Sequence, residues 1–247
     1  MDRLLAGATI HLVNTDPPYN VKVEPRSNNA IAAGLSSFPQ AKGSGDAEEA
    51  PEQGKHPSRR KRRARAAGKM RPKDRPLAND FVSPEAFDAL LLAWFGNLAR
   101  VLAPGRSFYI WGGYANCGNY PPVLKATGLY FSQAVIWVKE HPVLTRKDFM
   151  GNHEWCFYGW KEGAGHQFYG PTNAVDVWAV KKVNPQSMVH LTEKPVELAA
   201  RAIQYSSKPG ENVLDLFGGS GSTLIAAERT GRRPELPTDE DDPPHHR

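Results

Sequence analysis

Short apolar runs alternate with amphipathic segments over most of the chain. Five runs have the length and composition of strands: 8–14, 107–111, 130–139, 154–160 and 212–217. Apolar residues at helical spacing, with Pro or Gly at the ends, predict helices over 84–103, from Lys194 to about 208, and over 224–230, with a helix-and-turn region over 120–127. Strands that alternate with helices predict an α/β fold, with a mostly parallel sheet and helices on both faces.

Two stretches lack this pattern. Ala, Gly, Ser, Pro and basic residues dominate the segment 37–76, and acidic residues lie among four prolines in 234–247. Neither stretch buries enough apolar surface to offset its chain entropy, so we expect both to be disordered. The predicted domain therefore consists of residues 1–36 and 77–233, interrupted by a long insertion and followed by a tail.

The positive charge of the chain is local. The net charge is +5, but the segment 55–75 holds eleven Lys or Arg and one acidic residue, and the remaining residues sum to −5. This segment either binds phosphates without sequence preference or is a solvated run of charge, and both interpretations stay open.

Composition excludes several classes of protein. The chain has no run of 18 apolar residues and no secretory leader pattern, which excludes a membrane span and argues against secretion. Cys117 and Cys156 are too few for a disulfide framework or a cysteine-rich zinc site. We therefore expect a reduced, cytoplasmic protein without a metal site.

The first candidate motif is Asp16-Pro17-Pro18-Tyr19, directly after the first predicted strand. Ligands in open α/β sheets bind outside the carboxyl ends of strands. The two prolines restrict the backbone and so orient the Pro17 carbonyl. A carboxylate and a carbonyl aimed together match the two hydrogens of an exocyclic amine, and a tyrosine can stack on the attached ring. An ordinary strand-terminating turn is the alternative.

The second motif runs from Val213 to Thr223, where a strand enters a glycine-rich turn and then a helix. Glycines allow a ligand to approach the backbone closely, and a helix N-terminus favours a negative group. The spacing fits neither the P-loop, nor the dinucleotide fingerprint, nor the nucleophile elbow. The motif predicts a nucleotide-like or carboxylate-bearing cofactor, with a purely structural turn as the alternative.

Together these motifs resemble the amino-group DNA methyltransferases that use S-adenosylmethionine. The resemblance rests on Asp16–Tyr19, on Phe217–Gly221, on the segment His190–Pro195 (HLTEKP), and on a strand that begins near His153. The catalytic motif comes first and the cofactor motif last, which is the permuted order of the β group. The resemblance implies a Rossmann-like methyltransferase sheet and a role in DNA methylation and restriction-modification.

The resemblance also implies roles for individual residues. Asp16, Pro17, Pro18 and Tyr19 would form the catalytic motif. Asp16 and the Pro17 carbonyl would hold the target amine, and Tyr19 would stack on a base flipped out of double-stranded DNA. The cofactor would be lined by Asp215, Phe217, Gly218, Gly219, Ser220 and Gly221, with Ser222, Thr223 and Lys194 as further lining residues. Target recognition would lie in about 162–189, where Lys181, Lys182 and Asn184 are candidate DNA contacts.

Several alternatives stay open. Asp at position 16 favours adenine N6 over cytosine N4 as the target within the resemblance. Family members continue past the cofactor motif with a strand that ends in an acidic residue, which holds the ribose. Here Pro234 and Glu235 follow instead, so we expect the sheet to lack this strand and the C-terminus to be truncated. A non-catalytic DNA-binding remnant, or a methyltransferase acting on RNA or a protein amide, are the competing functions. No oligomeric state is predicted.

Overall fold

The computed structural model describes residues 5, 7–21, 81–143, 148–183 and 193–235. The chain divides into two units, Met1–Val21 with Val82–Arg247 and Lys22–Phe81, and only the first is described below. The insertion expected over 37–76 and residues 236–247 of the expected tail lie outside the described residues.

A seven-stranded mixed sheet forms the centre of the described unit, in the order β5-β3-β4-β2-β1-β6-β7. Its strands are β1 (Ile10–Thr15), β2 (Leu102–Gly112), β3 (Leu129–Val143), β4 (Gly151–Lys161), β5 (Val177–Ala179), β6 (Asn212–Leu214) and β7 (Arg233–Glu235). The pairs β1–β2, β1–β6, β6–β7 and β3–β5 are parallel, whereas β4 runs antiparallel to both β2 and β3. The prediction of a mostly parallel sheet is confirmed among the described strands.

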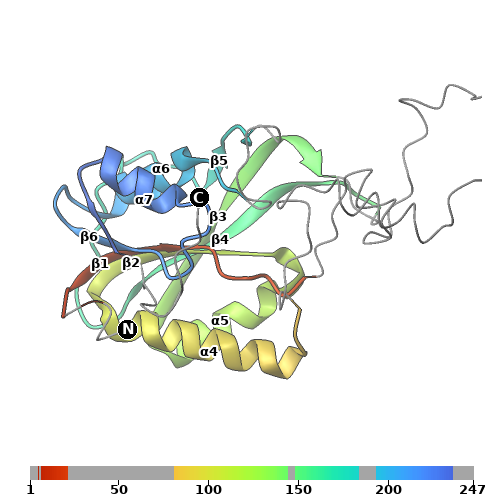
Figure 1. The fold of residues 1–247 in the computed structure, drawn as a ribbon, viewed down its shortest axis with the longest axis horizontal. Coiled ribbons are helices and arrows are strands. Elements are labelled where there is room, and N and C mark those ends of the chain that lie inside the picture. Colours follow the sequence, from red (N-terminus) through yellow and green to blue (C-terminus); the bar gives the residue numbers. More distant parts are fainter. Residues whose placement is uncertain (1–4, 6, 22–80, 144–147, 184–192, 236–247) are drawn as a thin grey trace, which may run out of the picture. The chain divides into compact units, whose positions relative to one another are not determined.

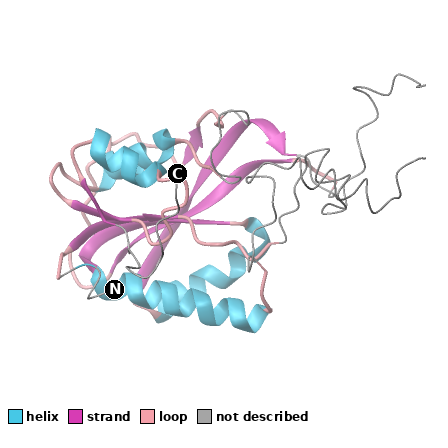
Figure 2. Cartoon of the chain, viewed as in Figure 1, coloured by secondary structure: helices cyan, strands magenta, loops and turns pink. Residues whose placement is uncertain are grey.

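Helices cover both faces of the sheet, as the sequence predicts (Figures 1 and 2). One face packs against α4 (Pro84–Val101) and α5 (Tyr120–Ala126), and the other against α6 (Val196–Ser206) and α7 (Ser222–Arg229). Each face has its own apolar core: Phe87, Leu91 and Phe95 of α4 lie in the first, and Leu198 and Ala202 of α6 in the second. A 3₁₀ helix, η2 (Tyr114–Asn119), joins β2 to α5.

Local signals set several element boundaries. Ser83 caps α4, because its hydroxyl accepts a hydrogen bond from the Ala86 N–H, and Pro84 stands at the first helical position. The strand β2 begins at Leu102, before the Pro104-Gly105 pair that we expected to end the helix. The helices α6 and α7 begin at Val196 and Ser222, each two residues from the predicted start.

The edge of the sheet formed by β7 differs from the expectation. Arg233–Glu235 pair in parallel with Asn212–Leu214, and the Asp215 N–H donates to the Glu235 carbonyl over 3.1 Å. Pro234 and Glu235, which we assigned to the tail, therefore form a strand. Composition did not reveal it, because this strand is three residues long, largely exposed and without apolar alternation. A Pro is tolerated there because β7 is an edge strand.

The parallel register places the candidate site. In β1, Leu12 lies opposite Val213 and Val13 opposite Leu214, so β1 and β6 end side by side. Asp16 follows β1, and Asp215 follows β6. The two predicted motifs, about 200 residues apart in the sequence, therefore meet at the same edge of the sheet.

Candidate functional site

The ends of β1 and β6 are joined by side-chain hydrogen bonds. The Thr15 hydroxyl donates to Asp215 Oδ1 over 2.8 Å and accepts from the Leu216 N–H over 3.0 Å. One residue earlier, Asn14 Nδ2 donates to the Thr223 hydroxyl over 2.9 Å. Asn14, Thr15, Asp215 and Thr223 are all buried, so this junction holds the strand that carries Asp16 against the glycine turn.

Asp16 presents its two carboxylate oxygens differently. Oδ2 accepts a hydrogen bond from Lys194 Nζ in an ion pair, whereas Oδ1 is buried and has no hydrogen-bond partner. A buried acceptor without a partner carries a desolvation cost that a ligand with N–H groups would relieve. Oδ1 is thus an acceptor that has no donor in the described part of the protein.

Lys194 lies between two carboxylates. Its ammonium contacts Glu154 Oε2 at 3.3 Å and the Tyr19 hydroxyl at 2.8 Å in addition to Asp16. Glu154 in turn accepts from Lys139 Nζ through Oε1 at 2.5 Å. Two lysines and two carboxylates therefore alternate in one cluster, drawn from β3, β4, the segment after β1 and the segment before α6.

The electrostatics follow from this pairing. Burial by itself raises the pKa of Glu154, but Lys194 and Lys139 overcome it and lower the pKa to about 2. Burial acts to lower the pKa of Lys194, and Asp16 and Glu154 raise it above its usual range. Burial, then Asp16 and Glu154, raise the pKa of the Tyr19 hydroxyl. At neutral pH these shifts keep Lys194 and Glu154 charged and the Tyr19 hydroxyl neutral.

Neighbouring residues contact both the backbone and the ring of Tyr19. Asn116 Nδ2 donates to the Tyr19 carbonyl over 2.6 Å. A Cβ atom added to Gly113 would lie 3.1 Å from the ring, so this glycine lets the ring approach the backbone after β2. Asn20 has φ 53°, which Asn tolerates, and its side-chain amide bonds both the N–H and the carbonyl of Val82. Within the motif, Pro17 is buried and Pro18 is exposed.

The glycine turn lies at the N-terminus of α7. Gly218, Gly219 and Gly221 have φ of 63°, 54° and 76°, a region that favours glycine. A Cβ atom on Gly219 or Gly221 would meet nothing within 4 Å, so the turn borders open space. Phe217 packs edge-on against Trp94, and Ser220 and Ser222 are half-buried. Burial raises the pKa of Asp215, at the other side of the turn.

The structure places the Lys194 ammonium against Asp16 of the catalytic motif, and its role as a lining residue of the cofactor stays a prediction. Sequence reasoning missed Glu154, Lys139 and Asn116. The only signal for Glu154 was its place at the start of a predicted strand. The pairing of β3 with β4 and of β4 with β2 brings it to Asp16, and no local pattern encodes that pairing.

Of the three candidate DNA contacts, the structure describes Lys181 and Lys182. Lys181 is exposed and pairs with Glu140 at 3.7 Å. Lys182 is half-buried, and Asn184 and His190 to Thr192 lie outside the described residues. The predicted recognition segment supplies β5, whose Trp178 is buried against Tyr109.

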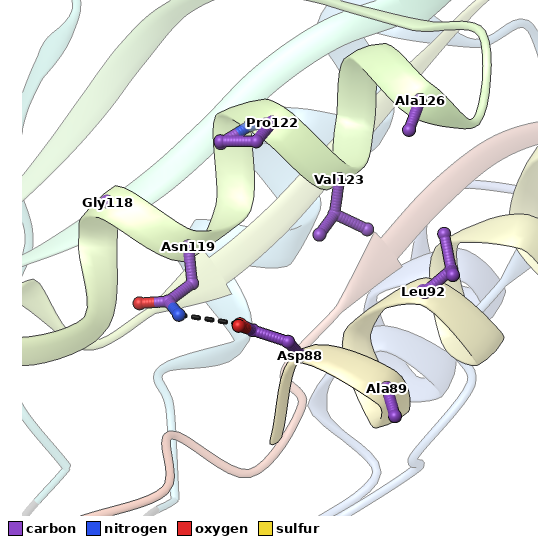
Figure 3. A pocket seen from close by; sticks show the side chains of 8 residues that line it. All are labelled: Asp88, Ala89, Leu92, Gly118, Asn119, Pro122, Val123 and Ala126. Carbon is purple, nitrogen blue, oxygen red and sulfur yellow. Dashed lines mark hydrogen bonds between the residues drawn. The ribbon is translucent and has the colours of Figure 1, made fainter. Parts of the chain in front are cut away.

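A pocket between α4 and the η2–α5 segment contains none of the predicted residues (Figure 3). Asn119 Nδ2 donates to Asp88 Oδ1 across it over 2.6 Å. In the part of the chain that the structure describes, no cluster of three or more His, Cys, Asp or Glu could hold a metal. None of the described helices has the length and apolarity to cross a membrane.

Comparison with known families identifies the chain. The family model described as DNA methylase, of the N6 and N4 type, matches residues 10–234. This chain belongs to that DNA methylase family. The match includes both motifs and Lys194, and it extends to Pro234 in β7.

Curated relatives are Type II methyltransferases. M2.DpnII of Streptococcus pneumoniae is 29% identical over 155 residues, which cover 57% of this chain and 58% of that protein. M.BglII of Bacillus subtilis is 24% identical over 172 residues, which cover 54% of this chain and 48% of that protein. The chain thus spans about half the length of the curated relatives it matches.

Solved DNA methyltransferases share the fold. The M1.HpyAVI–SAM complex superposes with a TM-score of 0.62 at 17% identity, over 97% of this chain and 87% of that chain. The cytosine-N4-specific PvuII enzyme gives a TM-score of 0.61 at 14% identity, over 92% of this chain and 74% of that chain. The Thermus thermophilus protein TTHA0409, complexed with S-adenosyl-L-methionine, gives a TM-score of 0.55 at 20% identity, over 94% of this chain and 82% of that chain. The predicted Rossmann-like methyltransferase fold is confirmed.

The position of Glu235 corrects one expectation about the family pattern. We expected the strand after the cofactor motif to be absent. Instead β7 lies beside β6 and ends in Glu235, half-buried, opposite Leu214 and next to Asp215. A strand therefore follows the cofactor motif beside β6, and it contains an acidic residue, Glu235.

Proposed function

We propose that this chain is a DNA methyltransferase that transfers a methyl group from S-adenosyl-L-methionine to the exocyclic amine of a base flipped out of double-stranded DNA, with adenine N6 as the favoured target. One observation carries the proposal: Asp16 Oδ1 is a buried, unpartnered acceptor at the sheet edge that also carries the glycine turn.

The chemistry explains why such an acceptor is needed. The lone pair of an amine on an aromatic base is delocalised into the ring, which makes the nitrogen a poor nucleophile. Asp16 Oδ1 and the Pro17 carbonyl would accept the two amine hydrogens and so favour a tetrahedral nitrogen with a localised lone pair. The Tyr19 ring would stack on the base, with its hydroxyl held by Lys194 and Glu154.

The residues at the end of β6 suit the cofactor. The open glycine turn at the N-terminus of α7 offers N–H groups to a carboxylate, and Asp215 has its carboxylate beside it. Glu235 lies on the strand after the glycine turn, where an acidic residue binds ribose hydroxyls in dinucleotide-binding sheets. When bound, S-adenosylmethionine supplies a methyl group on a sulfonium, which is an electrophile for the amine.

Flipping is required because the amine of a paired base lies inside the duplex. The preference for adenine rests on Asp16 as the first residue of its motif. The two curated relatives are named only as Type II methyltransferases, and one solved neighbour is a cytosine-N4 enzyme. The choice between adenine N6 and cytosine N4 therefore needs a chemical assay.

The test is methyl transfer from labelled S-adenosylmethionine to unmethylated bacterial DNA, followed by mass spectrometry of the nucleosides. We expect N6-methyladenine, and none with Asp16→Ala. As a control, Glu197→Gln removes only an exposed ion pair with Arg201 on α6. N4-methylcytosine would overturn the adenine assignment, and no methylated nucleoside from folded protein would overturn the proposed function. Methylation of RNA or of peptide alone would replace DNA as the substrate.

A further inference from the structure

The charged cluster that includes Asp16 has two lysines and two carboxylates, and its lysines are nearly closed to solvent. The side chains of Lys139 and Lys194 are 8% and 9% exposed, and those of Glu154 and Asp16 are 23% and 33% exposed. The order of contacts is Lys139, Glu154, Lys194, Asp16. Because each lysine has a carboxylate, the cluster avoids the large cost of an unpaired buried charge.

The Lys194 ammonium is held from several sides. Besides the two carboxylates and the Tyr19 hydroxyl, it lies 5.2 Å from the centre of the Tyr19 ring and 5.5 Å from that of Trp111. Lys139 is likewise fixed over the Trp137 ring at 4.9 Å. These contacts leave the ammonium little freedom, and so they determine which oxygen of Asp16 it takes.

We propose that Glu154 is a positioning residue. Together with Lys139 it holds Lys194 on Oδ2 of Asp16, so that Oδ1 is the acceptor left for the target amine. Glu154 acts through Lys194, and this inference rests on the function proposed above.

The first test is Glu154→Gln. We expect kcat at saturating cofactor to fall about ten- to a hundredfold, because small misplacements at a reacting centre have effects of this size. The dissociation constant for S-adenosylmethionine, measured by calorimetry, should stay within about twofold, because Glu154 is not part of the glycine turn. Glu197→Gln on α6 is the matched control and should leave both quantities unchanged.

A double variant separates positioning from charge balance. Glu154→Gln alone leaves two lysines with one carboxylate, whereas Lys139→Met with Glu154→Gln restores neutrality without restoring the contact to Lys194. We expect the double variant to unfold in urea close to the wild type but to keep the low kcat. If Glu154→Gln alone does not fold, the kcat of the double variant decides the test.

Two results would overturn the inference: wild-type kcat in Glu154→Gln, or recovery of kcat in the double variant. Failure of the proposed function is distinguishable, because then the wild-type chain itself would methylate no base.

Discussion

The Thr15 hydroxyl donates to Asp215 Oδ1 over 2.8 Å and so joins the end of β1 to the end of β6. The same hydroxyl accepts from the Leu216 N–H, which leads into the glycine turn. The residue before the catalytic motif therefore shapes the turn proposed to hold the cofactor, and the two motifs act as one unit.

Thr15→Val should lower both stability and cofactor affinity. Valine has the shape of threonine but leaves Asp215 and the Leu216 N–H short of a buried partner, which costs about 1–3 kcal/mol. The matched control is Thr127→Val. The Thr127 hydroxyl donates to backbone carbonyls at the end of α5, so its loss should not change the cofactor affinity. Urea unfolding and calorimetry measure the two effects; equal cofactor affinities for the two variants would contradict this role of Thr15.

Glu154 should make stability depend on pH. Its pKa is about 2 in the folded protein against an ordinary 4.5, so its contribution is present above about pH 4.5 and is lost as the pH falls toward 2. The unfolding free energy of Glu154→Gln should therefore vary less with pH in this window than that of Glu197→Gln. Urea titrations at several pH values measure the slopes, and parallel curves would show that Glu154 is not ion-paired.

Gly113→Ala should lower activity more than stability. Gly113 has φ −75°, which alanine adopts freely, but the added methyl group would lie 3.1–3.3 Å from three carbon atoms of Tyr19. The ring must shift, and we expect methyl transfer to fall about tenfold or more. Gly118→Ala, where the methyl group meets nothing within 4 Å, is the control. Steady-state kinetics on both variants decide, and equal rates would show that the position of Tyr19 is unimportant.

Glu235→Gln should weaken cofactor binding while the sheet persists. If Glu235 accepts from ribose hydroxyls at the end of β7, loss of its charge should raise the dissociation constant of S-adenosylmethionine about tenfold. Glu228→Gln on α7, with an exposed side chain, is the control. Unchanged affinity by calorimetry would leave the ribose without this partner and would favour the non-catalytic remnant.

Local patterns were sufficient where one segment contains its own signal. The helix α4 follows from Ser83, Pro84 and the spacing of its apolar residues, and β1 from one apolar run that ends at two prolines. The motifs at Asp16 and at the glycine turn were likewise visible, because each places reactive or permissive residues next to one another in the chain. The strand β7 was missed, because its three largely exposed residues pair with β6 but show no strand pattern in their own composition.

The sequence by itself determined the class of fold, the family resemblance and the two motifs, because periodicity, proline and glycine act over a few residues. Only the tertiary structure decided that Lys194 forms an ion pair with Asp16, and that Glu154 bridges Lys194 and Lys139. It also decided that Glu235 lies in a strand beside β6. These relations depend on strand order and register, which bring together side chains that no local pattern connects.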